Sequence, residues 1–378
     1  MGPLSGIRVL EFAGIGPGPF CGMLLADLGA EVVVITRTGG EGTPLEARYD
    51  LLNRGKRSAA INLKHPRGVE TALRLADHAD VVLEGYRPGV MERLGLGPDV
   101  CFARNARLVY GRMTGWGQDG PLAERAGHDI NYIALAGALH AIGRKDEPPV
   151  PPVNFVGDFG GGALYLALGV VAALFEARQS GRGQVVDAAI VDGTASLLTP
   201  LYGLLARGWW VDRRGENVID GGAPWYDVYQ TRDGGHIAVG PIEPKFFAEF
   251  ADATGLGADA VALQWDREHW PALRERLAAT FRQRTRGEWE EAFEGRDVCA
   301  APVLGMRESP VHPHLASRGT FVDVDGIVQP APAPRFSRTP GAIRHRPPEP
   351  GADTTDVLVE WGLSRSEVVG LREEGAIG

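Results

Sequence analysis

The chain has 378 residues, of which 44% are hydrophobic and 23% charged, an ordinary globular composition that is long enough for two domains. Its formal charge of −9 disfavours nucleic-acid binding, because that binding depends on Lys and Arg side chains that neutralise phosphates. Three cysteines, Cys21, Cys101 and Cys299, lie far apart without C-x-x-C spacing, so neither a disulfide framework nor a zinc site is indicated.

The first part of the chain alternates short apolar strands with helices. The pattern predicts strands at residues 7–12, 31–35, 81–84 and 108–113, and helices at 19–28, 67–79 and 89–94. Strands that alternate with helices are typical of a parallel sheet covered on both faces. The sequence therefore predicts an α/β fold.

One uncharged segment, residues 159–175, is near the lower length limit for a membrane-spanning helix. Its glycines, with Asp158 and Glu176 directly beside it, favour a helix buried inside the protein, so we expect no membrane span. The first residues lack a signal-peptide pattern, and the cytoplasm is therefore the expected location.

The pattern changes in the second half of the chain. A strand at 184–190 and a long helix from about 193 are followed by a hairpin pattern at 226–239 around Asp233-Gly234. Charged helices are predicted at 245–254, 269–283 and 287–294, and two short helices at 354–378. We expect a large domain over residues 1–205 completed by 335–378, a small α+β domain over 220–305, and a connector over 306–334. The interval 311–350 is rich in proline and is expected to be extended.

A glycine-rich loop, residues 14–18, lies between the first strand and the first helix. Its amides could approach a phosphate at the helix N-terminus, but a turn that permits close helix–strand packing is an equally good interpretation. The position that holds an acidic residue in dinucleotide-binding folds has Thr36 and Arg37 here, which would suit a 2′- or 3′-phosphorylated nucleotide better.

A local excess of positive charge follows at residues 53–67. This run has Arg54, Lys56, Arg57, Lys64 and Arg67 with no acidic residue, so it could attract a polyanionic small ligand. Two further arginines, Arg87 and Arg93, lie in or near the Gly-Tyr-Arg-Pro-Gly turn at 85–89, after a parallel strand, where open α/β sheets bind ligands.

Two residues stand out as candidates for chemistry. His128 lies in the Gly-His-Asp-Ile-Asn-Tyr segment at 127–132, and Asp158 lies in the Gly-Asp-Phe-Gly-Gly-Gly segment at 157–162. We expect Asp158 at the N-cap of the apolar helix, where capping alone would explain an aspartate. A lone histidine is also more often structural than catalytic.

Several blocks in the correct order resemble the family III CoA-transferase superfamily (CaiB/BaiF), and within it the α-methylacyl-CoA racemases. They include PLSGIRVLEFAGIGPGPFCGMLLADLGAEVV, LEGYRPGVMERLGLG, RMTGWGQDGP, AGHDINY, GDFGGG and GGAPWYDVYQTRDGGHIAVG. The resemblance implies a Rossmann-like large domain, a smaller domain and an interlocked homodimer. It implies an acyl-CoA thioester substrate, with no metal and no cofactor other than the coenzyme A of that substrate.

The resemblance also implies residue roles. His128 and Asp158 would be the two acid/base groups, Asn154 a partner of Asp158, and Asp129 and Glu243 groups that position or charge His128. Contacts with coenzyme A would come from Arg37, Ile61, Asn62, Leu63, Lys64, Gly85, Tyr86, Arg87, Arg93, Gly127, Ile130, Asn131 and Tyr132. Here Thr38 stands where the racemases have a proline after the matching arginine, and the loop 39–52 differs, which puts the phosphate contact of Arg37 in doubt.

Such residues would suit exchange of the proton at the α-carbon of a thioester. Removal of that proton needs a base of near-neutral pKa, which histidine supplies, and stabilisation of the enolate oxygen, for which the amides of residues 160–162 are candidates. Aspartate would need a raised pKa, whereas an N-cap position would lower it. Alternative functions are a CoA-transferase with Asp158 as the nucleophile, an NADP-linked oxidoreductase and a non-catalytic acyl-CoA carrier.

Overall fold

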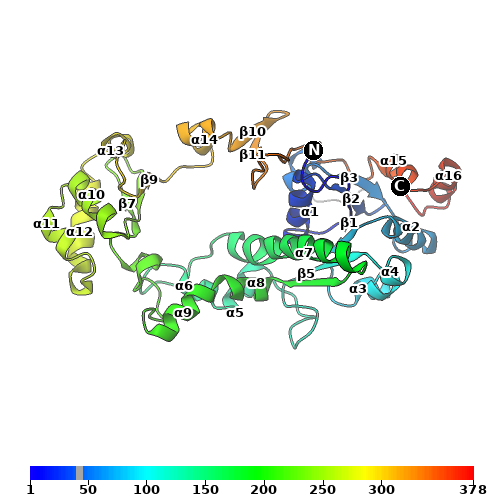
Figure 1. Cartoon of the computed structure of the whole chain (residues 1–378), viewed down its shortest axis with the longest axis horizontal. Coiled ribbons are helices and arrows are strands. Elements are labelled where there is room, and N and C mark those ends of the chain that lie inside the picture. The colour runs from blue at the N-terminus through cyan, green and yellow to red at the C-terminus, as the bar shows by residue number, and fades with distance from the viewer. Residues whose placement is uncertain (40–45) are drawn as a thin grey trace. The chain divides into compact units, whose positions relative to one another are not determined.

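The computed structural model describes residues 1–39 and 46–378, and it divides the chain into two compact units (Figure 1). The large unit comprises Met1–Ala136, Val153–Leu197 and Gly319–Gly378. The small unit comprises Gly137–Pro152 and Leu198–Arg318. Part of the divergent loop 39–52, residues 40–45, lies outside the described residues.

A six-stranded parallel sheet forms the centre of the large unit, in the order β3-β2-β1-β4-β5-β6. Its strands are β1 (Arg8–Phe12), β2 (Glu31–Thr36), β3 (Arg57–Ala60), β4 (Val81–Glu84), β5 (Val109–Thr114) and β6 (Val185–Ala189). This is the doubly wound order, and the predicted α/β fold with a Rossmann-like large domain is confirmed. The sequence analysis did not predict β3, which lies within the basic run.

Apolar side chains cover both faces of this sheet. Along β1, Val9 packs in one core and Leu10 and Phe12 in the other, because successive residues of a strand point to opposite faces. Helices that pack in the two cores are α1 (Pro17–Asp27), α2 (Pro66–Asp77), α3 (Val90–Arg93), α4 (Pro98–Arg104), α7 (Leu164–Ser180), α15 (Thr354–Glu360) and α16 (Arg365–Glu373). The C-terminal helices therefore complete the large unit, and in Figure 1 they lie near β3 and α2.

The long apolar helix differs from its prediction. It begins as a π-type segment (Phe155–Ala163) and continues as α7, and by length and composition it is the one described helix that could cross a membrane. Leu166 and Val170 pack on the sheet, whereas Leu168 and Phe175 are 66% and 68% exposed. The expectation that the whole helix is buried is wrong for this face, because one side alone meets the sheet.

Three antiparallel strands and four helices form the core of the small unit. The strands are β7 (Asp227–Gln230), β8 (His236–Val239) and β9 (Ala300–Pro302), and the helices are α10 (Pro244–Thr254), α11 (Ala258–Ala262), α12 (Trp270–Phe281) and α13 (Arg286–Phe293). Their core is aromatic, with Trp225, Phe247, Phe281 and Trp289 fully buried. The predicted hairpin is confirmed as β7 and β8.

Other elements are short. They are α5 (Asp129–Leu135), α6 (Ala138–Ala141), α8 (Ile190–Leu197), α9 (Thr199–Arg207), α14 (Pro313–Ser317), β10 (Phe321–Val324) and β11 (Ile327–Pro330). The helix expected from about 193 is thus broken into α8 and α9. The interval 311–350, expected to be extended, contains the hairpin β10–β11, where Gln329 is buried and accepts a 2.9 Å hydrogen bond from Arg54.

Candidate active site

A cavity of about 350 Å³ lies at the carboxyl edge of the parallel sheet. The loop after β1 and the turn after β4 both contribute to it, and these neighbouring strands are where the strand order reverses. Open α/β sheets bind ligands at this point because the two loops diverge to opposite faces. Its wall includes the side chains of Tyr86, Arg87, Trp116, Arg125, His128, Asp129, Tyr132 and Asp158.

Asp158 is half-buried in this cavity, near the start of the π-type segment Phe155–Ala163. The N-cap of that segment is Asn154, so the expectation that Asp158 is itself the cap is wrong. Asn154 Nδ2 donates a 3.3 Å hydrogen bond to Asp158 Oδ2. Burial raises the pKa of Asp158 and the charge of Asp129 adds to this rise, whereas Asn154 and His128 oppose it. Burial therefore outweighs the hydrogen bond, and this carboxylate is a stronger base than an ordinary aspartate.

Asp129 connects the segments that carry His128 and Asp158. Its side chain is buried, and its Oδ1 accepts a 2.7 Å hydrogen bond from the backbone N–H of Asp158. A Cβ atom at position 157 would lie 2.3 Å from the same oxygen, so only glycine fits there. We expected Asp129 to act on His128, but its hydrogen bond goes to the main chain of Asp158.

His128 is the N-cap residue of α5 and is exposed on the cavity wall. Its backbone N–H donates a 3.0 Å hydrogen bond to Asn131 Oδ1, which holds the start of the helix. The imidazole and the Asp158 carboxylate line the same cavity although 30 positions separate them in the sequence. An acid and a base can thus face one bound molecule.

The glycine-rich loop, residues 14–18, also forms part of the cavity wall. Gly16 is the N-cap of α1 and has a positive φ of 72°, which L residues rarely adopt. A Cβ atom on Gly16 would lie 3.4 Å from Asp158 Oδ2, so the loop passes close to the carboxylate. The loop is therefore part of the site, and it opens the N-terminus of α1 towards the cavity.

Tyr132 and Trp116 form an aromatic wall whose ring centroids are 4.7 Å apart in an edge-to-face arrangement. Cβ atoms at Gly115 and Gly127 would lie 2.0 Å and 2.6 Å from the Tyr132 ring, so both positions require glycine. Trp116, Gly115 and Arg125 were not identified as site residues from sequence. The Gly-Trp-Gly stretch of the RMTGWGQDGP block was the available signal.

The glycines after Asp158 serve packing. Cβ atoms at Gly161 and Gly162 would lie 2.5 Å from Thr194 Oγ1 and 3.0 Å from the Ile190 side chain of α8. These glycines, with Gly160, are absent from the wall of the described cavity. The structure thus gives no support to the expectation that residues 160–162 stabilise an oxyanion.

The candidate coenzyme A contacts fall into two groups. Gly85, Tyr86, Arg87, Gly127 and Tyr132 line the cavity. Residues that do not line the described cavity are Arg37, Ile61, Asn62, Leu63, Lys64, Arg93, Ile130 and Asn131. Ile61 is buried and bridges to Ile377, so its side chain cannot reach a ligand. Arg37 is exposed, and its charge lowers the pKa of Tyr86, although burial raises that pKa overall.

The basic run does not form a free cationic surface. Arg54 pairs with Asp27 at 2.6 Å, and Lys56 pairs with Glu11 at 2.8 Å, both fully inside the large unit. Arg57 pairs with Glu31 and Glu360, and Arg67 with Glu374. Four of the five cations of this run thus have acidic partners within the large unit, and its attraction for a polyanion stays a prediction.

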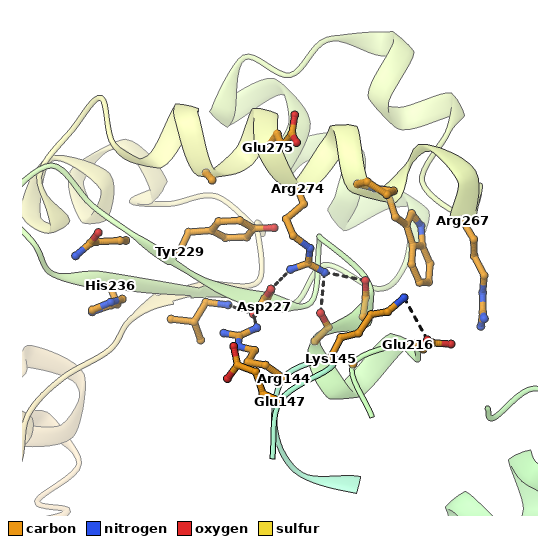
Figure 2. Close-up of a pocket in the computed structure, with 18 of the residues that line it drawn as sticks. Arg144, Lys145, Glu147, Glu216, Asp227, Tyr229, His236, Arg267, Arg274 and Glu275 are labelled. Atoms are coloured by element: carbon orange, nitrogen blue, oxygen red, sulfur yellow. Dashed lines mark hydrogen bonds and ion pairs between the residues drawn. The ribbon is translucent and has the colours of Figure 1, made fainter. Parts of the chain in front are cut away.

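The small unit holds another, wider cavity of about 1220 Å³, shown in Figure 2. Asp227 lies between Arg144 and Arg274 and forms ion pairs with both. Arg274 also donates 2.7 Å and 2.8 Å hydrogen bonds to the carbonyl oxygens of Gly221 and Gly222. The charges of Asp227, Arg144 and Arg274 in the wall of this cavity are therefore paired within the protein and join separate chain segments.

Glu243, the other residue expected to act on His128, also belongs to the small unit, where it is the N-cap residue of α10.

The profile of CoA-transferase family III matches residues 4–354. The chain belongs to this family. Among curated members, the mouse α-methylacyl-CoA racemase is 45% identical over 98% of this chain and 96% of the relative. The human α-methylacyl-CoA racemase is 43% identical over 99% of this chain and 97% of the relative.

Solved structures of the family agree with the fold. A CaiB/BaiF family protein from Brucella suis matches with a TM-score of 0.80 at 27% identity, over 95% of this chain and 99% of that protein. Within the described residues no cluster of His, Cys, Asp and Glu could hold a metal ion. A family III fold thus surrounds a cavity that brings an imidazole and a carboxylate together.

Proposed function

We propose that this chain is an α-methylacyl-CoA racemase that interconverts (R)- and (S)-2-methylacyl-CoA thioesters. The single observation that carries this proposal is that His128 and Asp158 line one cavity at the reversal of strand order. The full-length similarity to two curated racemases supports the same substrate class.

In the proposed mechanism, one deprotonated group removes the α-proton from one face and the other, protonated, returns a proton to the opposite face. Histidine suits both roles near neutral pH. Asp158 suits them because its raised pKa increases both its basicity and its protonated fraction. Since the two groups exchange protonation states in each turnover, the enzyme must be reset by solvent before it repeats the same direction.

The enolate oxygen needs donors. The N-terminus of α1 lines the cavity through Gly16 and Gly18. Pro17 and Pro19 have no N–H, and the N–H of Phe20 donates to the Gly16 carbonyl oxygen, so the donor of this first turn is the backbone N–H of Gly18, which has no partner inside the helix. We assign the oxyanion contact to this helix start, where the dipole also favours negative charge.

The coenzyme A part of the substrate would bind along the turn after β4 and the start of α5. Gly85, Tyr86, Arg87, Gly127 and Tyr132 are the contacts that the cavity favours. Arg37, Arg93, Asn62, Leu63 and Lys64 would act further along the nucleotide, outside the described cavity. The large domain would thus supply the site for coenzyme A, which enters as part of the substrate. The cytoplasmic location of the protein stays a prediction.

We further propose that the enzyme is an interlocked homodimer. The exposed apolar face of α7, with Leu168 and Phe175, needs a cover that a second copy would supply. Glu243, in the small unit, would then act on His128 of the partner subunit in the assembly.

Hydrogen–deuterium exchange tests the proposal. The enzyme is incubated with (R)-2-methylacyl-CoA in deuterated water, without an acceptor acid, and the α-position is followed by NMR. Deuterium incorporation with equilibration of the isomers is expected, and His128→Ala should lower the rate at least 100-fold for one isomer. Absence of exchange, together with transfer of CoA to an added carboxylic acid, would instead establish a transferase in which Asp158 is the nucleophile.

A further inference from the structure

A buried ion network lies behind the turn after β4. Arg112, on β5, donates from Nε to Glu84 Oε1 at 2.8 Å. The other two nitrogens of its guanidinium donate to Glu92 Oε1 and Oε2, at 2.8 Å and 3.3 Å. Arg112 and Glu84 are only 7% and 2% exposed, and Arg112 does not line the described cavity.

The network holds both ends of the turn. Glu84, at the end of β4, uses its second oxygen to accept a 2.7 Å hydrogen bond from the backbone N–H of Tyr86. Glu92 lies in α3, a helix of only four residues that is too short to be stable by itself. One guanidinium therefore fixes the main chain at Tyr86 and the helix that follows the turn.

The same helix carries Arg93. A Cβ atom on Gly89 would lie 3.1 Å from an Arg93 guanidinium nitrogen, so that side chain lies against the turn. Because Glu92 and Arg93 are consecutive residues of α3, the contact that holds Glu92 also fixes the backbone position from which the Arg93 side chain extends. The candidate coenzyme A contacts at residues 85–87 and at Arg93 thus depend on one buried residue.

We propose that Arg112 is a positioning residue for coenzyme A binding, acting through Glu84 on the turn 85–87 and through Glu92 on Arg93. This inference rests on the proposed function, in which those residues contact the coenzyme. The chemistry requires arginine: a lysine keeps the charge, but its three donors sit on one nitrogen at the end of a flexible stem and cannot reproduce the planar fork that places Nε against Glu84 and the other two nitrogens against the two oxygens of Glu92. The proton-transfer groups His128 and Asp158 take no part in the network.

The test compares Arg112→Lys and Glu92→Gln with the control Arg104→Lys. Arg104 makes a similar forked contact with Asp77 and Glu70, but on the outer surface of α4 and α2. Free coenzyme A is titrated by calorimetry, and kcat and KM are measured with 2-methylacyl-CoA. Arg112→Lys should raise the Kd of coenzyme A and the KM about tenfold, with kcat within about twofold, and Glu92→Gln should raise both about threefold. Arg104→Lys should leave all three unchanged.

The outcomes separate the two proposals. If the wild-type protein binds no coenzyme A, the proposed function itself fails. If the wild type binds but folded Arg112→Lys binds equally well, or loses kcat at unchanged Kd, the positioning role is wrong. If Arg112→Lys does not fold, Glu92→Gln still decides the question. The Glu92 side chain is 45% exposed, and when it is neutralised the buried charge of Arg112 keeps its partner Glu84.

Discussion

The backbone N–H of Asp158 donates a 2.7 Å hydrogen bond to the buried carboxylate of Asp129. This contact joins the start of α5, which carries His128, to the segment that carries Asp158. A hydrogen bond between a side chain and the main chain therefore ties together the two segments that carry the proposed acid/base groups. The second oxygen of Asp129 is buried and has no hydrogen-bond partner among residues 1–39 and 46–378, so its charge acts on the cavity unscreened by a partner.

Asp129→Asn should move the acid limb of the pH–rate profile to lower pH. The negative charge of Asp129 helps to raise the pKa of Asp158, and asparagine removes that charge while it keeps an oxygen to accept the amide. Asp158 then stays deprotonated to lower pH in the direction in which it is the base. The profile of kcat/KM for each isomer is the measurement, with Asp99→Asn on exposed α4 as the control. An acid limb that stays in place for both isomers would contradict this electrostatic role.

Asn154→Ala should move the same limb in the opposite direction. Asn154 donates a hydrogen bond to the Asp158 carboxylate and so lowers its pKa against the effect of burial. Without this donor the pKa of Asp158 rises further. In the direction that uses Asp158 as the base, acidification then abolishes activity at a higher pH than in the wild type. Limbs that move the same way in Asn154→Ala and Asp129→Asn would show that Asp158 is not the titrating group.

The fold could be largely predicted because its signals are local. Buried strands such as β2 (Glu31–Thr36) contain unbroken apolar runs, and the small unit contains a hairpin whose residues alternate around an Asp-Gly turn. The strand β3 was missed because Arg57 and its neighbours look like a solvated charged run. In the structure Arg57 pairs with Glu360, which lies 303 positions away, and no local pattern reports that.

Site residues that belong to a sequence motif could be predicted, whereas contacts between residues far apart in the sequence could not. His128 and Asp158 stood out in glycine-rich blocks of the sequence, and the cavity brings them together. The hydrogen bond from Asp158 to Asp129 and the role of Arg112 were not predictable, because each depends on which elements pack in three dimensions. Gly161 illustrates the limit: it could have served catalysis or packing, and its contact with Thr194 favours packing.

Lys56→Met should destabilise the large unit by about 3–5 kcal/mol, because it leaves Glu11 buried without its cation. Lys56 is fully buried, and its ammonium donates to Glu11, to the Pro19 carbonyl oxygen and to Asn53 at 2.9–3.0 Å. The free energy of unfolding in urea, followed by circular dichroism, is the measurement.

Two variants interpret the Lys56 result. Lys56→Met combined with Glu11→Gln should recover part of the loss, because the uncompensated charge is gone. Arg67→Gln removes an exposed pair with Glu374 and should cost no more than about 1 kcal/mol. Equal losses for Lys56→Met and Arg67→Gln would refute the argument from burial.

Gly115→Ala should lower kcat/KM at least tenfold while the protein stays folded. The added methyl would lie 2.0 Å from the Tyr132 ring, which must move away from Trp116 and change the shape of the cavity wall. Gly203→Ala is the matched control, because a Cβ atom there meets nothing within 4 Å and alanine favours the helix α9. Steady-state kinetics decide, and wild-type kcat/KM in Gly115→Ala would mean that the position of Tyr132 does not matter.

Leu168→Glu should convert the proposed dimer into monomers. Leu168 is 66% exposed on α7, on the face that Phe175 shares, and a carboxylate at the centre of an apolar interface loses its hydration without gaining a partner. Sedimentation velocity at micromolar concentration should show half the wild-type mass, and activity should fall with it if the partner subunit completes the site. Val369→Glu on α16 changes an exposed apolar residue outside that face and should sediment as the wild type does. A wild-type protein that is already monomeric and active would refute the proposed dimer, and with it the role of Glu243 across subunits.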